Sequence, residues 1–326
     1  MSAPPPDWRP GAPLTHLRRR AALLAAVRAF FAGRGVLEVD TPQLVNHAVT
    51  DLHLHSAEVR WPGAAARTRY LHTSPEYAMK RLLAAGSEDI YQLCHVFRGD
   101  EQGAHHNGEF TLVEWYRRGW NIEALMQEVD ALLRCLLGAA AGVAARQLSY
   151  EQAFVEILGC NPLLDSDGAL ADCARAQGSD AALISRCTRD ELLDLLIGTY
   201  VGPQLGRDGP VFVHRYPASQ AALARLDAAD PRVALRFELY LHGVELANGF
   251  EELADADEQR ARFGADQTAR AARGLTVPSM DEFLIDALRA GLPPCSGVAL
   301  GFDRVLMIAC GARHISEVLP FSDERA

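Results

Sequence analysis

Two arginines and two glutamates stand where they could act on a nucleoside triphosphate. Arg98 follows a predicted strand and opens a polar loop, and Arg304 begins a predicted helix after a strand of small residues. A guanidinium in such a place can hold a phosphate through two parallel hydrogen bonds. Glu245 and Glu252 lie on one predicted strand, and Mg²⁺ prefers a few carboxylates together with phosphate oxygens. These four residues predict that the chain handles ATP with Mg²⁺.

Arg98 belongs to a longer pattern, Phe97–Glu101 followed by His105–Phe110. The arginine leaves one strand, a polar loop turns, and a second strand returns, so the guanidinium can grip a phosphate at the loop. Taken alone, the pattern also fits a surface hairpin whose arginine forms a salt bridge.

The two glutamates are seven positions apart, after a predicted two-residue turn at His242-Gly243. An odd offset places two side chains on opposite faces of a regular strand. One bulge at Asn248-Gly249 would return both carboxylates to one face. Mg²⁺ and ATP phosphates would then relieve their repulsion. The alternative is a solvated acidic edge.

Small residues alternate along Ser296–Gly301 and run into the helix that carries Arg304. Glycine in such a strand lets a planar ring lie against the backbone, and the arginine can reach a phosphate or stack on a base. A strand–helix junction packed with small residues would explain the same pattern.

The histidines and cysteines predict no dedicated metal centre. His53 and His55, and also His105 and His106, are spaced as paired ligands, but no acidic third ligand accompanies them. The seven cysteines contain no Cys-x-x-Cys pair, which indicates reduced thiols in a cytoplasmic protein.

Length and charge narrow the class of protein. The 326 residues carry a formal net charge of −10, which disfavours a large tRNA-binding surface because phosphate neutralisation dominates such binding. Arg18–Arg20 fits one solvated helical turn, and no apolar run is long enough for a membrane span. Prolines near the start predict a flexible tail over residues 1–14 and one domain over residues 15–326.

Hydrophobic periodicity predicts strands joined by short loops, with helices inserted irregularly between them. The expected strands are Val36–Val39, Tyr70–Thr73, Ile90–Phe97, Glu109–Arg117, Val211–His214, Arg236–Leu241, Val244–Phe250 and Cys295–Leu300. The expected helices include Thr15–Ala32, one after Ser74-Pro75, Ile122–Leu137, three behind capping boxes at Ser149, Thr188 and Ser279, Asp255–Arg273 and one from Phe302. This order predicts an α/β protein of the α+β type, with a mainly antiparallel sheet flanked by helices.

Together and in this order, the motifs resemble the three ordered motifs of class II aminoacyl-tRNA synthetases. Gly35–Pro42 is similar to the first, which builds a homodimer interface in that family. Phe97–Tyr116 is similar to the second, and Gly297–Arg304 to the third. Within the class, Ser74–Tyr77 and Asn248–Leu253 follow the lysyl-tRNA synthetase pattern. The resemblance spans residues 14–321, essentially a whole catalytic core.

One branch of that family fits better than the full synthetases. The first motif begins near residue 15, so the anticodon-binding barrel that precedes the core in lysyl-tRNA synthetases is not expected. Thr50–Leu54, Tyr216–Gln220 and Cys295–Gly301 look like the truncated paralogues that attach (R)-β-lysine to elongation factor P. The resemblance implies activation of (R)-β-lysine or lysine by ATP, transfer to a lysine of elongation factor P, and a homodimer, with tRNA and membranes not expected as partners.

The resemblance also implies roles for individual residues. Arg98 and Arg304 are the catalytic candidates, Arg98 at the α-phosphate and Arg304 at the far phosphates. The ATP-binding set is Arg98, Gly99, Asp100, His106, Asn107, Phe110, Glu245, Leu246, Gly301 and Arg304. The amino acid set is Ser74, Pro75, Glu76, Tyr116, Glu252 and Ala299, with Glu114 as a further candidate. The Mg²⁺ ligands would be Glu245 and Glu252.

The chain departs from the synthetase pattern at two places. Gly99-Asp100 replaces an Asn-Glu pair after the arginine, which shortens the carboxylate by one methylene. Ala299 replaces a glycine, and its methyl group narrows the floor beneath the amino acid. We expect this methyl group to disfavour an α-amino group and to suit a lysine isomer whose amine has moved.

Two other functions remain open from the sequence. A minimal lysyl-tRNA synthetase-like enzyme could use tRNA or a small-molecule acceptor. A catalytically inactive paralogue could bind lysine or ATP to regulate a partner, but Arg98, Glu245, Glu252 and Arg304 are all present.

Overall fold

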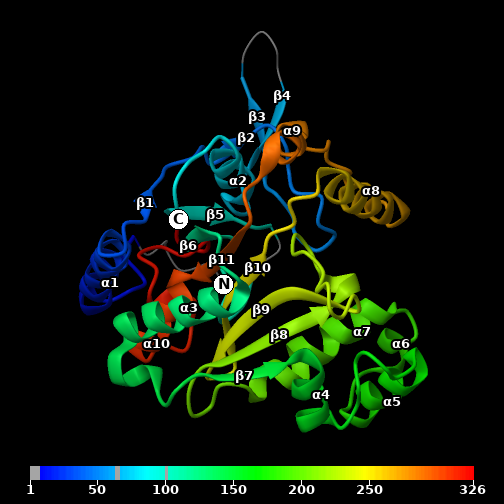
Figure 1. Cartoon of the computed structure of the whole chain (residues 1–326). Helices are drawn as coiled ribbons and strands as arrows, with labels where there is room; N and C mark the ends of the chain where they lie inside the picture. The colour runs from blue at the N-terminus through cyan, green and yellow to red at the C-terminus, as the bar shows by residue number, and fades with distance from the viewer. Residues whose placement is uncertain (1–7, 63–66, 100–101) are drawn as a thin grey trace, which may run out of the picture.

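A computed structural model describes residues 8–62, 67–99 and 102–326. An eight-stranded sheet runs through the molecule in the order β1-β5-β6-β11-β10-β9-β8-β7, and a three-stranded sheet has the order β2-β4-β3 (Figure 1). All pairings are antiparallel except β1 with β5 and β7 with β8. The predicted mainly antiparallel sheet flanked by helices is confirmed.

The strands of the large sheet are β1 (Leu37–Glu38), β5 (Ile90–Phe97), β6 (Glu109–Arg118), β7 (Arg146–Ser149), β8 (Val211–Pro217), β9 (Val233–Leu241), β10 (Val244–Glu251) and β11 (Cys295–Gly301). Those of the small sheet are β2 (Leu44–Val45), β3 (Glu58–Trp61) and β4 (Arg67–Leu71). The α-helices are α1 (Leu14–Ala32), α2 (Glu76–Ala84), α3 (Ile122–Leu137), α4 (Tyr150–Leu158), α5 (Asp167–Ala176), α6 (Ala181–Ile184), α7 (Arg189–Leu196), α8 (Ala256–Ala272), α9 (Glu282–Gly291) and α10 (Phe302–Cys310).

Three helices cover one face of the large sheet. α1, α3 and α10 pack on one another and on the sheet, and they gather on one side of it in Figure 1. Val113 and Trp115 of β6, and Val298 and Leu300 of β11, enter this core. Because side chains alternate along a strand, the residues between them face the opposite side. That opposite face is where the candidate site lies.

Two smaller cores flank this opposite face. One joins α2, α8 and α9 around Met79, Leu83 and Leu288. The other joins α4, α5 and α7 to β8 around Phe154 and Leu193. The sheet face is therefore lined by helices on two sides.

Several predicted element starts are confirmed in detail. Asn121 accepts a hydrogen bond from the Ala124 N–H at the start of α3. Ser149 and Thr188 form complete capping boxes. His242 and Gly243 have φ of +54° and +76°, as a two-residue turn with both central residues left-handed requires.

Three local predictions are wrong. Thr15 does not cap α1, which starts one residue earlier after Pro13 without a side-chain cap. Ser279 does not cap α9, because the Asp281 carboxylate lies closer to the helix and accepts from its first N–H groups. The bulge in β10 lies between Glu245 and Ala247 rather than at Asn248-Gly249.

The displaced bulge has the predicted consequence. Leu246 and Ala247 both pack into the core on the helix-covered face, which shifts the alternation of β10 by one position. Glu245 and Glu252 therefore share the opposite face of the sheet. The domain division at residue 14 stays a prediction, although Gly11 N–H already donates to the Pro320 carbonyl.

Candidate active site

Three structural elements bring carboxylates together on the face of the sheet opposite α1, α3 and α10. Glu114 and Tyr116 come from β6, Glu252 follows β10, and Glu76 begins α2. Ser74 donates to Glu114 Oε2 at 2.7 Å, and the Tyr116 hydroxyl donates to Glu114 Oε1 at 2.8 Å. The predicted amino acid residues thus lie in one cluster rather than scattered over the fold.

A buried lysine ties two of these carboxylates together. Lys80 Nζ lies 2.7 Å from Glu76 Oε1 and 2.5 Å from Glu252 Oε2. Lys80 was not predicted as a site residue, because one lysine within an amphipathic helix forms no motif. Only the fold reveals that α2 packs next to the end of β10.

Burial makes these carboxylates unusually weak acids. Burial and the charge of Glu76 raise the pKa of Glu114 to about 7, against hydrogen bonds from Ser74 and Tyr116. Burial raises the pKa of Glu252 to about 8, although the Lys80 ammonium opposes the shift. Such strongly shifted groups in one place are typical of functional sites. A bound cation would favour their ionised forms.

Gly297 forms the floor between Tyr116 and Glu252. A Cβ atom on Gly297 would overlap the Tyr116 ring and lie 2.6 Å from Glu252 Oε1. Ala299, two positions along β11, pairs with Glu114 of β6 and with Asn248 of β10. Ala299 and Phe110 both pack against the small core of Cys94, Val96 and Leu112. Ala299 thus adjoins Glu114 of the carboxylate cluster on one side and this small core on the other.

The arginines occupy the other end of the same face. The Arg98 guanidinium lies 5.1 Å from the Phe110 ring centroid, and its Nε donates to the Thr73 carbonyl at 3.3 Å. Gly99 pairs with His55 in a short antiparallel bridge. Asp100, which was predicted to bind ATP, lies outside the described residues.

Arg304 is held at the start of α10 by three contacts. It donates to the Glu245 carbonyl at 2.8 Å and the His105 carbonyl at 3.3 Å, and it lies 2.7 Å from His106 Nε2. Its guanidinium also lies 3.8 Å from the Glu245 carboxylate. Arg304, His106 and Glu245 therefore come together, as predicted.

Glu245 links the two arginines electrostatically. Partial burial and the neighbouring Glu238 raise the pKa of Glu245, whose side chain is 40% exposed, while the charges of Arg304, Arg236 and Arg98 oppose the shift. The carboxylate thus stands among cations and one further acid, as expected for a group that shares its surroundings with a polyanion and a metal ion.

Three further members of the predicted ATP set, Asn107, Leu246 and Gly301, present no charged side chain to a nucleotide. The Asn107 side chain donates to the Glu109 carbonyl and to Asp323, so it ties the loop to the C-terminal segment. Leu246 points into the core, so only its backbone can face a nucleotide. Gly301 leaves space beside Arg304, because a Cβ atom there would meet nothing closer than 3.6 Å.

Several buried polar atoms on this face lack a hydrogen-bond partner among the described residues. They are Thr73 Oγ1, Gln92 Nε2, Asn248 Oδ1 and Glu252 Oε1. Buried polar atoms are normally paired, so unpaired ones in a cluster indicate a missing polar ligand. The residues therefore fit a bound amino acid and nucleotide.

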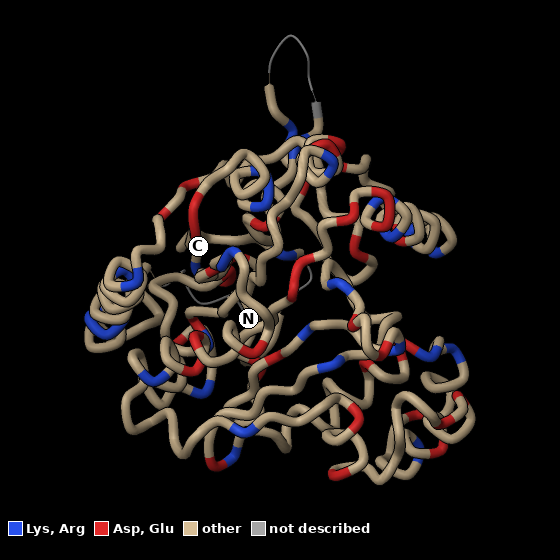
Figure 2. Tube along the Cα trace, viewed as in Figure 1, with Lys and Arg blue, Asp and Glu red and all other residues tan. Residues whose placement is uncertain are grey.

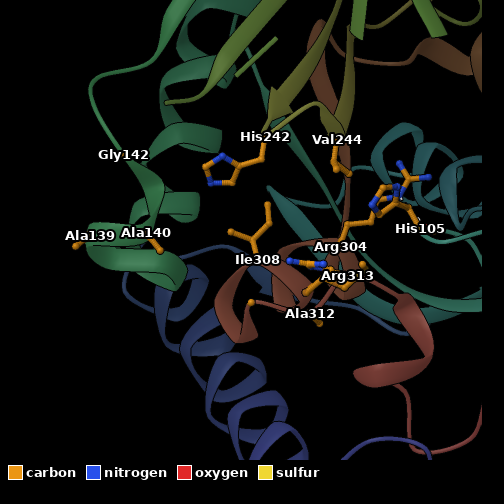
Figure 3. A pocket seen from close by; sticks show the side chains of 12 residues that line it. His105, Ala139, Ala140, Gly142, His242, Val244, Arg304, Ile308, Ala312 and Arg313 are labelled. Atoms are coloured by element: carbon orange, nitrogen blue, oxygen red, sulfur yellow. Dashed lines mark hydrogen bonds between the residues drawn. The ribbon is translucent and has the colours of Figure 1, made fainter. Parts of the chain in front are cut away.

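A cavity of about 670 Å³ adjoins the arginine end of the site. Figure 3 shows it bordered by α10, the β9–β10 turn and the chain after α3. Arg304 and His105 contribute to its wall. Within residues 8–62, 67–99 and 102–326, no group of three or more His, Cys, Asp or Glu side chains could hold a metal ion.

The charge distribution gives no sign of a separate nucleic-acid half. Acidic and basic positions are interspersed over the described trace in Figure 2. None of the helices among the described residues is long and apolar enough to cross a membrane.

Comparisons with known proteins agree with this geometry. The family model for class II tRNA synthetases (D, K and N) matches residues 7–325. The elongation factor P–(R)-β-lysine ligase of Pectobacterium atrosepticum is 50% identical over 323 residues, covering 98% of each chain. The proteins of the same name from Erwinia tasmaniensis and Salmonella typhi are 49% and 48% identical, again over 98% of each chain. The chain therefore belongs to the class II tRNA synthetase family (D, K and N), and within it to the elongation factor P–(R)-β-lysine ligases.

Proposed function

We propose that this chain activates (R)-β-lysine, or lysine, with ATP and transfers it to a lysine side chain of elongation factor P. The observation that carries this proposal is the buried cluster of Glu76, Glu114 and Glu252 beside Tyr116. A pocket of three carboxylates suits a substrate with ammonium groups. The acceptor is inferred from relatives of about 50% identity, which are elongation factor P–(R)-β-lysine ligases.

The first reaction joins the amino acid to AMP. The substrate carboxylate attacks the α-phosphorus of ATP, an acyl–phosphate bond forms, and pyrophosphate leaves. Arg98 stabilises the charge that develops on the α-phosphate, and Arg304 holds the far phosphates. The protein contributes positioning and charge stabilisation rather than covalent chemistry.

Phe110 lies beside Arg98 and offers an aromatic face to the adenine ring. His106 stands next to Arg304 along the path of the phosphates. Mg²⁺, brought with ATP, would be held by Glu245 beside Arg304 and would neutralise phosphate charge, because Glu252 lies with Lys80 at the other end of the site. Because Lys80 already contacts Glu252, we assign Glu252 chiefly to the amino acid.

The second reaction releases AMP. An uncharged amine of the acceptor lysine attacks the carbonyl carbon of the adenylate, an amide bond forms, and the amine loses a proton. The acceptor side chain must then reach the adenylate on the face of the sheet that carries Ala299. No residue of the chain needs to become covalently modified.

We also propose a homodimer formed through the Gly35–Pro42 segment. β1 lies at the edge of the large sheet, and the Leu37 side chain there is 46% exposed. An exposed leucine on an edge strand favours contact with another chain.

The decisive experiment offers two acceptors together. Purified protein, ATP and Mg²⁺ are incubated with lysine or (R)-β-lysine, elongation factor P and lysine tRNA, and intact-mass and acyl-tRNA assays follow. A mass gain on the factor with no charged tRNA is the expected result. Charged tRNA with an unmodified factor would favour a minimal synthetase instead, and absence of adenylate would favour a regulatory paralogue.

A further inference from the structure

Lys80 is the only lysine in the sequence. The chain contains 32 lysines and arginines, and every one of them except Lys80 is an arginine. The two residue types differ in shape, because lysine ends in a compact ammonium with three donors and arginine in a wide planar fork. A chain that uses arginine at every other basic position keeps an ammonium at this one.

The surroundings of Lys80 explain what an ammonium does there. Its side chain is 1% exposed, and Nζ bridges Glu76, one helical turn earlier on α2, to Glu252 at the end of β10. Although burial opposes it, the charges of Glu252 and Glu76 raise the pKa of Lys80. The lysine therefore stays charged and fixes two carboxylates that belong to different elements.

Some carboxylate oxygens of the cluster already accept hydrogen bonds from the protein, and at least one does not. Glu114 already accepts from Ser74 and Tyr116. Glu252 Oε1 is buried and accepts no hydrogen bond within the described part of the chain. It lies over the Gly297 backbone, where a Cβ atom would come within 2.6 Å of it. An ammonium of the ligand that donates to this oxygen would complete the shell of Glu252.

The charges of the cluster do not balance without a ligand. When ionised, Glu76, Glu114 and Glu252 together carry three negative charges, and Lys80 supplies one positive charge. Two ammonium groups would neutralise the rest. An amino acid with a second amino group carries this number, whereas one with an apolar side chain would leave a buried carboxylate without a counter-charge.

We propose that Lys80 is a positioning residue that sets amino acid specificity. By bridging Glu76 and Glu252, it directs Glu252 Oε1 toward the substrate and makes the pocket accept diamino acids and reject amino acids with one amine. This inference rests on the proposed activation of a lysine-type substrate. It adds Lys80 to the residues that distinguish this substrate from amino acids with a single amine.

Replacing Lys80 should weaken the preference of the site for an amino acid with a second amine. A methionine at position 80 would fill similar space without charge, so the three carboxylates would repel and take up protons or turn away. An arginine would need room for a wider head in a site that is closed to solvent. Both changes should weaken the preference for a second amine more than they weaken ATP binding.

The test compares lysine with norleucine, which lacks the terminal amine, in ATP–pyrophosphate exchange. The wild-type enzyme should favour lysine by on the order of 10⁴, as sites built to pair a buried polar group do. In Lys80→Met the ratio should fall to about 100 or less. KM for ATP should change little. Arg81→Met on the same helix, which is exposed, is the matched control and should keep the full ratio.

Chemical rescue separates a positioning role from a merely structural one. Lys80→Ala leaves space near Glu76 and Glu252 that a small alkylammonium ion can enter. Propylammonium should raise kcat/KM for lysine in Lys80→Ala by about 10-fold or more, since each 1.4 kcal/mol recovered is tenfold. It should leave Lys80→Met unchanged, because the methionine side chain occupies that space.

The outcomes are distinct. An unchanged lysine-to-norleucine ratio in folded Lys80→Met would overturn the inference, as would a lack of rescue in folded Lys80→Ala. If the Lys80 variants do not fold, Glu76→Gln removes one carboxylate charge and should reduce the same ratio, and an unchanged ratio there would also overturn it. Failure of the wild-type enzyme to exchange pyrophosphate with any diamino acid would instead refute the proposed function.

Discussion

Ala299 of β11 lies directly opposite Glu114 of β6 in the antiparallel pair that floors the candidate site. On its other side it pairs with Asn248 of β10, whose side-chain oxygen is buried and unpaired among the described residues. The Ala299 methyl group also packs against the small core of Cys94, Val96 and Leu112, which Phe110 contacts as well. We predict that the backbone of a bound amino acid meets the sheet at this position.

This position predicts that Ala299 influences the choice between lysine isomers. Removing the methyl group in Ala299→Gly should make room for an α-amino group and shift kcat/KM toward α-lysine by about 10-fold relative to (R)-β-lysine, the scale of one methyl group in a pocket. Adenylate formation with each isomer gives the ratio. An unchanged preference would show that the methyl group does not act on the amine.

Gly297 should tolerate no side chain. In Gly297→Ala the added methyl group would collide with the Tyr116 ring and crowd Glu252, so we expect a loss of about 1–3 kcal/mol in stability or amino acid binding. Thermal unfolding and KM for lysine measure the two effects. Gly264→Ala in α8 is the control, because a Cβ atom there meets nothing and alanine stabilises a helix by about 1 kcal/mol.

The weak acidity of Glu114 predicts a pH dependence of amino acid binding. Its pKa is raised to about 7, so near neutral pH much of the free enzyme holds this proton. A bound ammonium favours the carboxylate and should release the proton. Affinity for lysine should therefore rise as pH rises through 7. Calorimetry in buffers of different ionisation enthalpy should detect proton release, and proton uptake would contradict the prediction.

Glu114 should also make stability depend on pH, and its contribution to stability should fall as pH rises. The folded protein holds the Glu114 proton more tightly than an unfolded chain does, with a pKa of about 7 against 4.5. Its contribution to stability is therefore complete below pH 4.5 and is lost as pH rises through 7. Comparison of Glu114→Gln with the wild type by denaturant unfolding across that range isolates this term, and a parallel pH dependence of the two proteins would argue against it.

Arg98 should be required for adenylate formation. We expect Arg98→Ala to lose on the order of 3 kcal/mol of transition-state stabilisation, as other charge-stabilising groups do. Its KM for lysine should change less, because the carboxylate cluster is built from other elements. Exposed Arg118 on the same sheet is the control. Near-normal adenylate formation by Arg98→Ala would remove Arg98 from the mechanism.

Most of the sheet could be predicted because alternation and turn residues are local signals. β5 and α3 have the predicted bounds, and the turn at His242-Gly243 is as expected. The short helices α5 and α6 were not predicted, because their caps, Ser166 and Asp180, lack the glutamate or glutamine three residues later that completes a capping box. The cap of α9 was misassigned because Ser279 and Asp281 are both good caps, and sequence alone did not decide between them.

The site could be predicted only where its residues belong to ordered motifs. Arg98, Phe110 and Arg304 follow such motifs, and the fold brings them near one another. Lys80 was missed because its role depends on Glu252, which lies far along the chain and meets it only because the fold places α2 beside the residue that follows β10. Contacts of that kind are set by tertiary structure rather than by spacing.

The lack of other lysines predicts that the enzyme does not acylate its own side chains. An aminoacyl-adenylate can react with any accessible uncharged amine, forming an amide and releasing AMP. Lys80 is buried between two carboxylates and stays charged, and arginine is a poor nucleophile because it remains protonated. Apart from the amino terminus, the chain should therefore gain no mass when incubated with ATP and (R)-β-lysine without an acceptor.

An introduced lysine should reverse this resistance. Arg313 is exposed on the wall of the cavity that includes Arg304, so Arg313→Lys places an amine near the nucleotide end of the site. Intact-mass and peptide analysis should find the acyl group on residue 313. Arg146→Lys on β7, at the far edge of the sheet, should be labelled more slowly, because only adenylate released into solution reaches it. An adduct on Lys80 of the wild-type enzyme would contradict its burial, because only an accessible, deprotonated amine could form one.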